Sequence, residues 1–187
     1  MNEMKENKKI NVRAMVFTAI MAAIICVASP FAIPLPGLVP ITLGTLAIYL
    51  SGALLGGKRA TIAVIVFILI GAVGLPVFSG FTGGFAKLMG VTGGYIIGYI
   101  PLALITGIFT KKSDKNMLLM PVGMVLGTAA LYIFGTAWFM IATGSGLAAA
   151  LMSCVVPFLI GDGIKIVVAT AIAQPIHTRL NSYLSGI

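Results

Sequence analysis

Long apolar runs dominate the chain, and short polar or charged segments separate them. Charged residues are absent from four blocks, residues 14–57, 60–86, 88–110 and 116–161. A helix of about 20 apolar residues crosses the roughly 30 Å hydrocarbon core of a bilayer. Each block is long enough for one or two such helices, so the pattern predicts an all-α integral membrane protein.

Prolines, small residues and a basic pair mark where these blocks turn. Prolines between positions 30 and 40 predict an outer connection, because proline interrupts helices. Lys58-Arg59 predicts an inner turn, and the small residues at 142–150 predict a second outer connection. We expect a single transmembrane domain over residues 1–187 that begins with a cytoplasmic tail at 1–13. Its six spans are expected at about 14–29, 41–57, 60–74, 91–110, 117–140 and 152–174.

The segment from Gly71 to Gly98 does not fit this simple pattern, because it holds nine glycines in 28 residues. So much glycine is unfavourable in an ordinary lipid-facing helix. Non-helical backbone at membrane depth is tolerated only where protein buries it or where it lines a cavity. We therefore expect this segment to lie against the bundle and to form part of a cavity wall.

Composition agrees with a membrane protein, since 59% of the residues are hydrophobic and 9% are charged. Soluble domains average about 45–50% apolar and about 25% charged residues. The net charge of +8 does not indicate nucleic-acid binding, because the cations separate the apolar blocks. With both termini inside, all cations except Lys87 and Lys165 fall on the cytoplasmic side, as the positive-inside rule requires.

No residue pattern typical of an enzyme is present. Gly52 to Lys58 have the spacing of a phosphate-binding loop, but Arg59 stands where Ser or Thr would bind Mg²⁺. The sequence offers no carboxylate pair and no metal-ligand cluster, and its single histidine, His177, follows the last expected span. We therefore expect no catalysis, no cofactor and no metal, and any ATP-driven step would need a partner protein.

Asp162 is the one acidic residue inside an apolar stretch, and Lys165 follows it by one helical turn. Residues three apart share a helix face. Charges inside a membrane span are costly and by default indicate a functional site. Two interpretations stay open: a structural ion pair within the last helix, or a polar anchor for a small solute.

Several segments resemble the BioY family, the biotin-specific substrate-binding (S) components of energy-coupling-factor transporters. They are GLPVFSGFTGG at 74–84, GGY at 93–95, VPITL at 39–43 and FLIGDGIK at 158–165. The resemblance extends over about residues 14–174. Gly44 departs from it, because glutamine is expected there in many members.

The resemblance implies a six-helix bundle in the prokaryotic plasma membrane, with both termini inside. It implies high-affinity capture of biotin near the outer face and release inward with an energy-coupling module. That module contains a transmembrane coupling subunit and two ABC-type ATPases. Ala19 and Ala23 match the small-residue motif on the first helix that docks on the coupling subunit.

The resemblance also suggests which side chains meet biotin, a molecule with a ureido ring, an apolar thiophane ring and a carboxylate tail. We expect Asp162 to accept hydrogen bonds from the ureido N–H groups and Lys165 to donate to a polar group of the ligand. The remaining expected contacts are hydrogen bonds from Thr42 and Ser79, apolar walls at Phe81 and Tyr95, and close backbone approach at Gly83, Gly84 and Gly94.

Three points stay open at the level of sequence. The opposite orientation, with the biotin carboxylate near Asp162 and Lys165, is one alternative. An S component for a different vitamin is a second. The third is a stand-alone secondary transporter that uses an ion gradient through Asp162.

Overall fold

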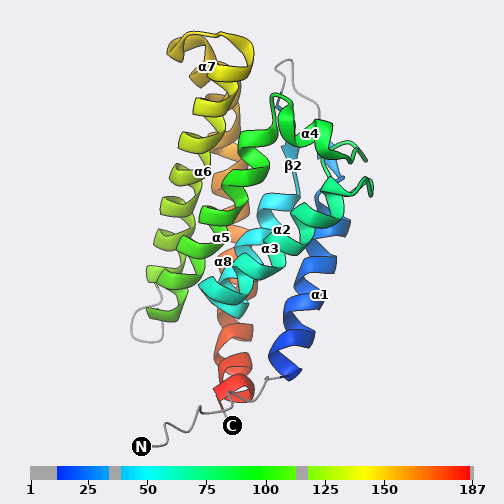
Figure 1. Cartoon of the computed structure of the whole chain (residues 1–187). Helices are drawn as coiled ribbons and strands as arrows, with labels where there is room; N and C mark the ends of the chain where they lie inside the picture. Colours follow the sequence, from blue (N-terminus) through cyan, green and yellow to red (C-terminus); the bar gives the residue numbers. More distant parts are fainter. Residues whose placement is uncertain (1–11, 34–38, 113–117, 186–187) are drawn as a thin grey trace, which may run out of the picture.

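The computed structural model describes residues 12–33, 39–112 and 118–185, which form a helical bundle (Figure 1). The helices in these ranges are α1 (Val12–Ala28), α2 (Gly44–Leu55), α3 (Gly57–Ala72), α4 (Phe85–Met89), α5 (Gly93–Lys112), α6 (Leu119–Thr143), α7 (Leu147–Cys154) and α8 (Val156–Ser185). Two short strands, β1 (Ala32–Ile33) and β2 (Ile41–Thr42), pair antiparallel between α1 and α2. The start of α1 and the end of α8 lie at the same end of the bundle.

Three helical stretches among the described residues are long and apolar enough to cross a membrane. They are Gly93–Lys111, Leu119–Thr143 and Leu147–Ile176, and the last of these combines α7 with α8. Helices α1 and α2 are apolar but shorter. Together with the other helices they make the fold mostly helical, as the apolar blocks predict.

Helices α5 and α6 form the most extensive helix pair, and small residues allow their close approach. A Cβ at Gly98 would lie 2.9 Å from a methyl group of Leu131, and one at Gly127 would lie equally near Leu102. At Gly135, a Cβ would clash with the ring of Tyr95. An added Cβ would therefore require its neighbours to shift, at Gly98 only the end of the Leu131 side chain and at Gly135 the whole Tyr95 ring.

The glycine-rich segment leaves helical geometry where its composition predicts. Helix α3 ends at Ala72, and the chain stays non-helical until α4 begins at Phe85. Backbone hydrogen bonds from Gly84 N to the Gly71 carbonyl (2.7 Å) and from Gly80 N to the Pro30 carbonyl (2.9 Å) hold this segment against the bundle. It is thereby anchored beside the end of α1.

Three boundaries differ from the expectations. Helix α8 continues past the expected end at 174 to Ser185, with Pro175 inside it. Part of the connection expected at 142–150 is helical, because α7 begins at Leu147. The cause is the alanine- and leucine-rich run, since these are the strongest helix formers. The segment expected as one helix at 152–174 is interrupted at Val155, whose φ is −126° and which precedes the Val156-Pro157 start of α8. Proline is well suited to the first turn of a helix, where Pro157 lies.

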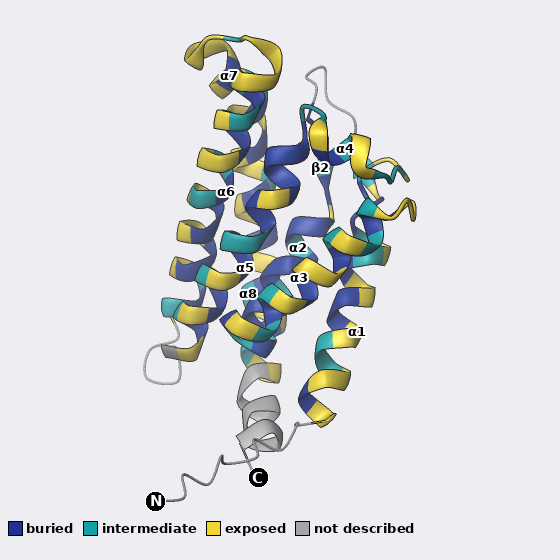
Figure 2. Ribbon diagram, in the orientation of Figure 1, coloured by how far each residue is buried: buried dark blue, intermediate teal, exposed yellow. Residues whose placement is uncertain are grey.

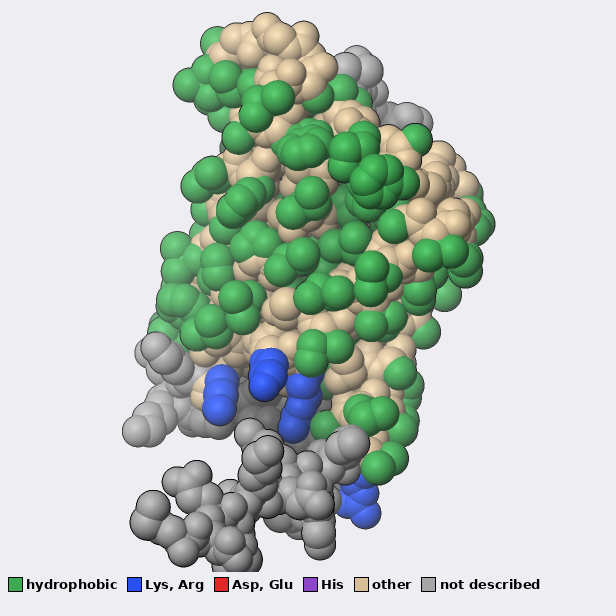
Figure 3. Space-filling view, viewed as in Figure 1, with side chains coloured by type: hydrophobic (Ala, Val, Ile, Leu, Met, Phe, Trp, Pro, Cys, Tyr) green, Lys and Arg blue, Asp and Glu red, His purple; other side chains and the backbone are tan. Residues whose placement is uncertain are grey.

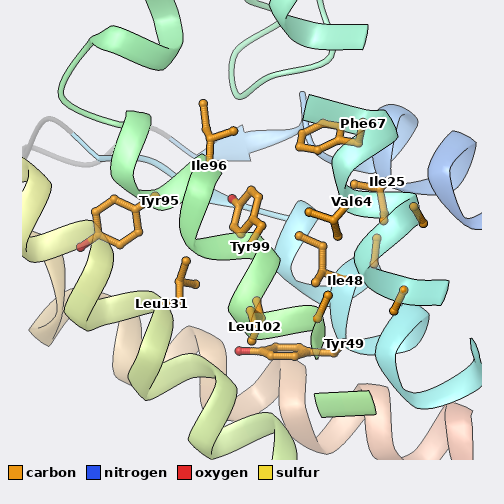
Figure 4. Packing of buried hydrophobic residues seen from close by; sticks show 14 of the residues in the cluster. Ile25, Ile48, Tyr49, Val64, Phe67, Tyr95, Ile96, Tyr99, Leu102 and Leu131 are labelled. Carbon is orange, nitrogen blue, oxygen red and sulfur yellow. The ribbon is translucent and has the colours of Figure 1, made fainter. Parts of the chain in front are cut away.

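Apolar side chains fill the interior and also cover the outside. In Figure 4, Tyr99 and Leu102 from α5 point toward Ile48 from α2 and toward Val64 and Phe67 from α3. Figure 2 shows the exposed sides of α1 and α6 facing outward. Much of this outer surface is large apolar side chains, as a lipid-facing surface requires (Figure 3).

Candidate functional site

A buried ion pair lies on the inward side of α8. The Asp162 Oδ1 atom lies 2.9 Å from the Lys165 Nζ atom. Only 4% of the Asp162 surface and 9% of the Lys165 surface is exposed. Helical geometry brings the two side chains together because they are three residues apart, so the pair predicted from the sequence is formed.

Two further helices complete the polar cluster around this pair. The Tyr132 hydroxyl on α6 donates to Asp162 Oδ2 over 2.7 Å. The Lys165 ammonium also donates to Thr45 Oγ1 on α2 over 2.9 Å. Thr45 in turn donates to the carbonyl of Thr42 over 3.4 Å. The cluster therefore links α2, α6 and α8 through charged and neutral hydrogen bonds.

A cavity of about 30 Å³ lies against the ion pair, and we call it the lower cavity. Its polar walls are Asp162, Lys165, Thr42 and Thr45, joined by the tyrosines of α5 and α6. The lining side chains are Val39, Pro40, Thr42, Thr45, Tyr95, Tyr99, Leu131, Tyr132, Phe158, Asp162 and Lys165. Two opposite charges in an otherwise apolar or hydroxyl-bearing wall suit a ligand with both donors and acceptors.

A second cavity of similar volume adjoins the first, and we call it the upper cavity. Its walls come from the end of α1, the glycine-rich segment and the start of α5. The lining side chains are Ser29, Val39, Pro40, Thr42, Phe67, Phe78, Ser79, Thr92, Tyr95, Ile96 and Tyr99. Five of these residues also line the lower cavity, so a shared wall is formed by Val39, Pro40, Thr42 and the two tyrosines of α5.

The sequence-predicted residues divide into two groups. Thr42 and Tyr95 line both cavities, Asp162 and Lys165 line the lower one, and Ser79 lines the upper one. The others, Phe81, Gly83, Gly84 and Gly94, are not among the side chains that line either cavity.

The residues of the second group have roles visible in the backbone and packing. Phe81 is 61% exposed, has a positive φ of 56° and contacts Phe31 edge-on at 5.5 Å. A Cβ at Gly83 would clash with the Leu75 carbonyl, and one at Gly94 would clash with Trp138. Gly84 has a φ of 95°, which favours glycine. These four residues shape the glycine-rich segment and its junction with α5.

Ala19 and Ala23 lie on the exposed side of α1. Ala19 lines a groove of about 490 Å³ between α1 and the beginning of α3. The groove is mostly apolar, and Lys58 and Arg59 lie at its polar end. Small side chains on an exposed helix allow a second helix to approach closely in a bilayer.

Sequence reasoning missed Thr45, Tyr132 and Ser29. One signal was present for Tyr132, because Thr128, Tyr132 and Thr136 recur at intervals of four and lie on one face of α6. All three make buried or half-buried side-chain hydrogen bonds, with Tyr49, Asp162 and Tyr95 respectively. A polar stripe in an apolar helix thus indicates which face points inward.

Comparisons with known proteins place these features in a family. The model of the BioY family matches residues 4–182. The chain is 37% identical over 161 residues to the biotin transporter BioY of Thermotoga maritima, which covers 86% of this chain and 94% of that protein. It is 34% identical over 163 residues to the biotin transporter BioY of Rhodobacter capsulatus, covering 78% of this chain and 82% of that protein.

A solved structure has the same fold. It is the crystal structure of an S-component for biotin from an ECF-type ABC transporter. The two structures align with a TM-score of 0.82 at 31% sequence identity, over 94% of this chain and 95% of the other.

Proposed function

The chain belongs to the BioY family and is a multi-pass protein of the prokaryotic plasma membrane, and we therefore propose that it is the membrane subunit that binds biotin. It captures biotin with high affinity at the outer face and delivers it inward with an ATP-driven energy-coupling-factor module. The module's transmembrane coupling subunit and two ABC-type ATPases supply the energy. The one phosphate-loop-like segment of this chain is not suited to ATP, because Arg59 stands where Ser or Thr is needed to bind Mg²⁺.

The hydrogen-bonding capacity that the ion pair retains is the observation that carries this proposal. A carboxylate offers about four acceptor sites and an ammonium offers three donors. Within the described contacts, Asp162 accepts from Lys165 and Tyr132, and Lys165 donates to Asp162 and Thr45. Asp162 can therefore accept from the two ureido N–H groups, and Lys165 keeps one donor for the ureido carbonyl.

The polarity of the two cavities matches that of biotin. We assign its ureido ring to the lower cavity, its thiophane ring to the walls at Tyr95 and Tyr99, and its tail to the Ser79 end of the upper cavity. Each cavity of about 30 Å³ has room for little more than a water molecule. Binding of biotin therefore requires the shared wall at Val39, Pro40 and Thr42 to move, so that the two cavities join and widen.

Titration of the purified protein with biotin and with other vitamins tests this function. Saturable binding of biotin, at least about a hundredfold tighter than of any other vitamin, is expected. An S component for a different vitamin would reverse that preference, and absence of saturable biotin binding would reject the proposal.

The same titration tests the site. Asp162→Asn and Lys165→Ala are each expected to weaken biotin binding by about tenfold or more, since a hydrogen bond to a charged group contributes about 1.5–3 kcal/mol. Lys111→Ala, which removes an exposed cation at the end of α5, is the matched control. If both site variants bind biotin like the parent, the site assignment is wrong.

We further propose six spans with both termini in the cytoplasm. The Lys and Arg side chains visible in Figure 3 gather at the end of the bundle where α1 begins and α8 ends. Positive charge next to spans favours the cytoplasmic side. Helices α1 and α3 have 17 and 16 residues, close to the lower limit for a span. Helix α2 is shorter, and we propose that it crosses the membrane together with strand β2, which precedes it.

A further inference from the structure

Ser29 is the first residue after α1, and its side-chain hydroxyl has no hydrogen-bond partner among the described residues. Its side chain lines the upper cavity, and only 2% of its surface is exposed. Its backbone N–H donates to the Ile25 carbonyl, but its Oγ has no hydrogen-bond partner among the described residues. A buried hydroxyl without a partner costs about 1–3 kcal/mol, so such an atom calls for a specific explanation.

Comparison within the protein shows what is particular about Ser29. Only two other described side chains have a buried oxygen without a partner, Ser51 and Thr106. Neither lines the upper or the lower cavity. Ser29 alone of the three can therefore satisfy its hydroxyl with a ligand that enters the upper cavity.

Gly44 provides the space in which this hydroxyl lies. A Cβ at position 44 would clash with the Ser29 Oγ atom and would lie 3.2 Å from Thr42 Oγ1. The backbone N–H of Gly44 is already bound to Thr42 Oγ1 over 3.1 Å. The absence of a side chain at Gly44 thus leaves the Ser29 hydroxyl free to turn toward the cavity.

The chemistry of the upper cavity identifies the ligand group. Its polar lining consists of hydroxyl groups, including Ser29, Ser79 and Thr92, and contains no carboxylate. Each hydroxyl can donate one hydrogen bond, and a carboxylate is a pure acceptor. The only described carboxylate near the site, Asp162, lines the other cavity. The Lys165 ammonium in that cavity is already paired with Asp162 at 2.9 Å. An anionic group is therefore accommodated better at the Ser29 end, where no like charge lies in the cavity wall.

We propose that the Ser29 hydroxyl donates a hydrogen bond to the carboxylate of bound biotin, and that Gly44 keeps the space for this contact open. This inference rests on the proposed biotin-binding function. It adds a second anchor, at the opposite end of the ligand from Asp162 and Lys165. Discrimination between biotin and analogues without the carboxylate then depends on Ser29.

Binding of biotin and of biotinol, in which a hydroxymethyl group replaces the carboxylate, tests the proposal. Ser29→Ala is expected to weaken biotin binding about tenfold or more and biotinol binding no more than about threefold, because charge-assisted hydrogen bonds are about twice as strong as neutral ones. The matched control is Ser51→Ala, which removes another buried hydroxyl without a partner and is expected to leave both affinities unchanged.

Gly44→Ala provides a second and independent variant. Its methyl group is expected to displace the Ser29 hydroxyl and to weaken biotin binding to a similar extent. In the double variant with Ser29→Ala the two losses should not add, because both remove the same contact. Full additivity would overturn the role of Gly44.

The outcomes separate this inference from the function on which it rests. If the parent protein shows no saturable biotin binding, the proposed function itself fails. The proposed Ser29 contact is wrong if the parent binds biotin and Ser29→Ala binds it equally well. It is also wrong if Ser29→Ala weakens the binding of biotin and of biotinol to the same degree. Melting temperatures of all variants in detergent identify any loss that arises from unfolding.

Discussion

The Asp162 carboxylate shows how a single charged residue is accommodated inside an apolar bundle. Removing a carboxylate from water is costly unless it is paired and hydrogen-bonded. Lys165 and Tyr132 occupy one oxygen each, at 2.9 and 2.7 Å. Because the two partners approach from different helices, they also fix the direction in which the remaining acceptor sites point.

Tyr132 should therefore act as a positioning residue for Asp162. We expect Tyr132→Phe to weaken biotin binding by about threefold to tenfold, less than the loss of a direct hydrogen bond to a charged group (about 1.5–3 kcal/mol), because Tyr132 acts through Asp162. Titration of detergent-purified protein measures the loss. In the Asp162→Asn background the same change should have little further effect, because the contact that Tyr132 supports is already altered.

Tyr49→Phe is the matched control for this prediction. Tyr49 is a buried tyrosine whose hydroxyl also bonds to α6, at Thr128, but it lines neither cavity. We expect its removal to lower the melting temperature without weakening biotin binding. An equal loss of affinity in both variants would indicate that Tyr132 acts only through stability.

The sequence predicts one half of this cluster and not the other, for a physical reason. Asp162 and Lys165 are neighbours on one helix, so their spacing alone brings them together. Their contacts with Thr45 and Tyr132 span 120 and 30 positions. Such contacts depend on which helix faces pack together, and local periodicity does not determine this. The Thr128, Tyr132 and Thr136 stripe indicates a face of α6 but not the helix opposite it.

Among the elements, the junction of α5 and α6 determines where the tyrosine walls of the site lie. Gly94, Gly98 and Gly135 permit contacts that a Cβ would prevent. The Tyr95 ring packs over Gly135, and its hydroxyl donates to the Cys154 carbonyl over 3.0 Å. Close packing of these helices therefore places a ring that borders both cavities.

Gly135→Ala should destabilise the protein by about 1–3 kcal/mol, the usual cost of overpacking. The added methyl group has to displace the Tyr95 ring, so biotin binding should weaken as well. Thermal unfolding in detergent, with and without biotin, measures both effects. Gly163→Ala is the control for stability, because nothing lies within 4 Å of the added Cβ and helix propensity favours alanine. A melting temperature unchanged by Gly135→Ala would contradict the packing argument.

The exposed side of α1 leads to a different prediction, on assembly. Ala19→Leu together with Ala23→Leu should leave biotin affinity unchanged, because neither alanine lines the upper or lower cavity. The larger side chains should prevent a partner helix from approaching α1. We expect at least a tenfold loss of coupling subunit recovered by co-purification.

Ala129→Leu is the matched control for assembly, since Ala129 is an exposed alanine on α6. It should retain full recovery of the coupling subunit. If the α1 variant also retains it, the docking surface lies elsewhere. A simultaneous loss of biotin binding would instead indicate that α1 has been displaced.

Element boundaries show where sequence reasoning is limited. The interruption of helical geometry after α3 follows from glycine content, which acts locally on the backbone. The start of α7 was missed because the residues up to Ala150 include many small side chains, which are found both in connections and in helices. Helix propensity decides that case, because alanine has the highest of all residues.

At the scale of the whole molecule, the arrangement of charge predicts orientation in the membrane. Arg13, Lys58, Arg59 and Lys111 belong to the ends of α1, α3 and α5 that lie on one side of the bundle, whereas α7 lies at the other end (Figure 1). With Cys26 and Cys154 replaced by alanine, Ala148→Cys should react with an impermeant maleimide on intact cells. Lys58→Cys should react only after permeabilisation, and the reverse pattern would contradict the proposed orientation.

The last prediction separates a module-dependent subunit from a stand-alone transporter. A gradient-driven mechanism through Asp162 would require this carboxylate to gain and lose a proton during transport. That carboxylate is already bound by the buried Lys165 ammonium at 2.9 Å and by the Tyr132 hydroxyl at 2.7 Å, so such a cycle would have to break both contacts. In proteoliposomes with an imposed proton gradient, we therefore expect the protein alone to bind biotin without accumulating it. Accumulation should begin only when the coupling subunit, both ATPases and ATP are added, and robust uptake by the protein alone would refute this division of labour.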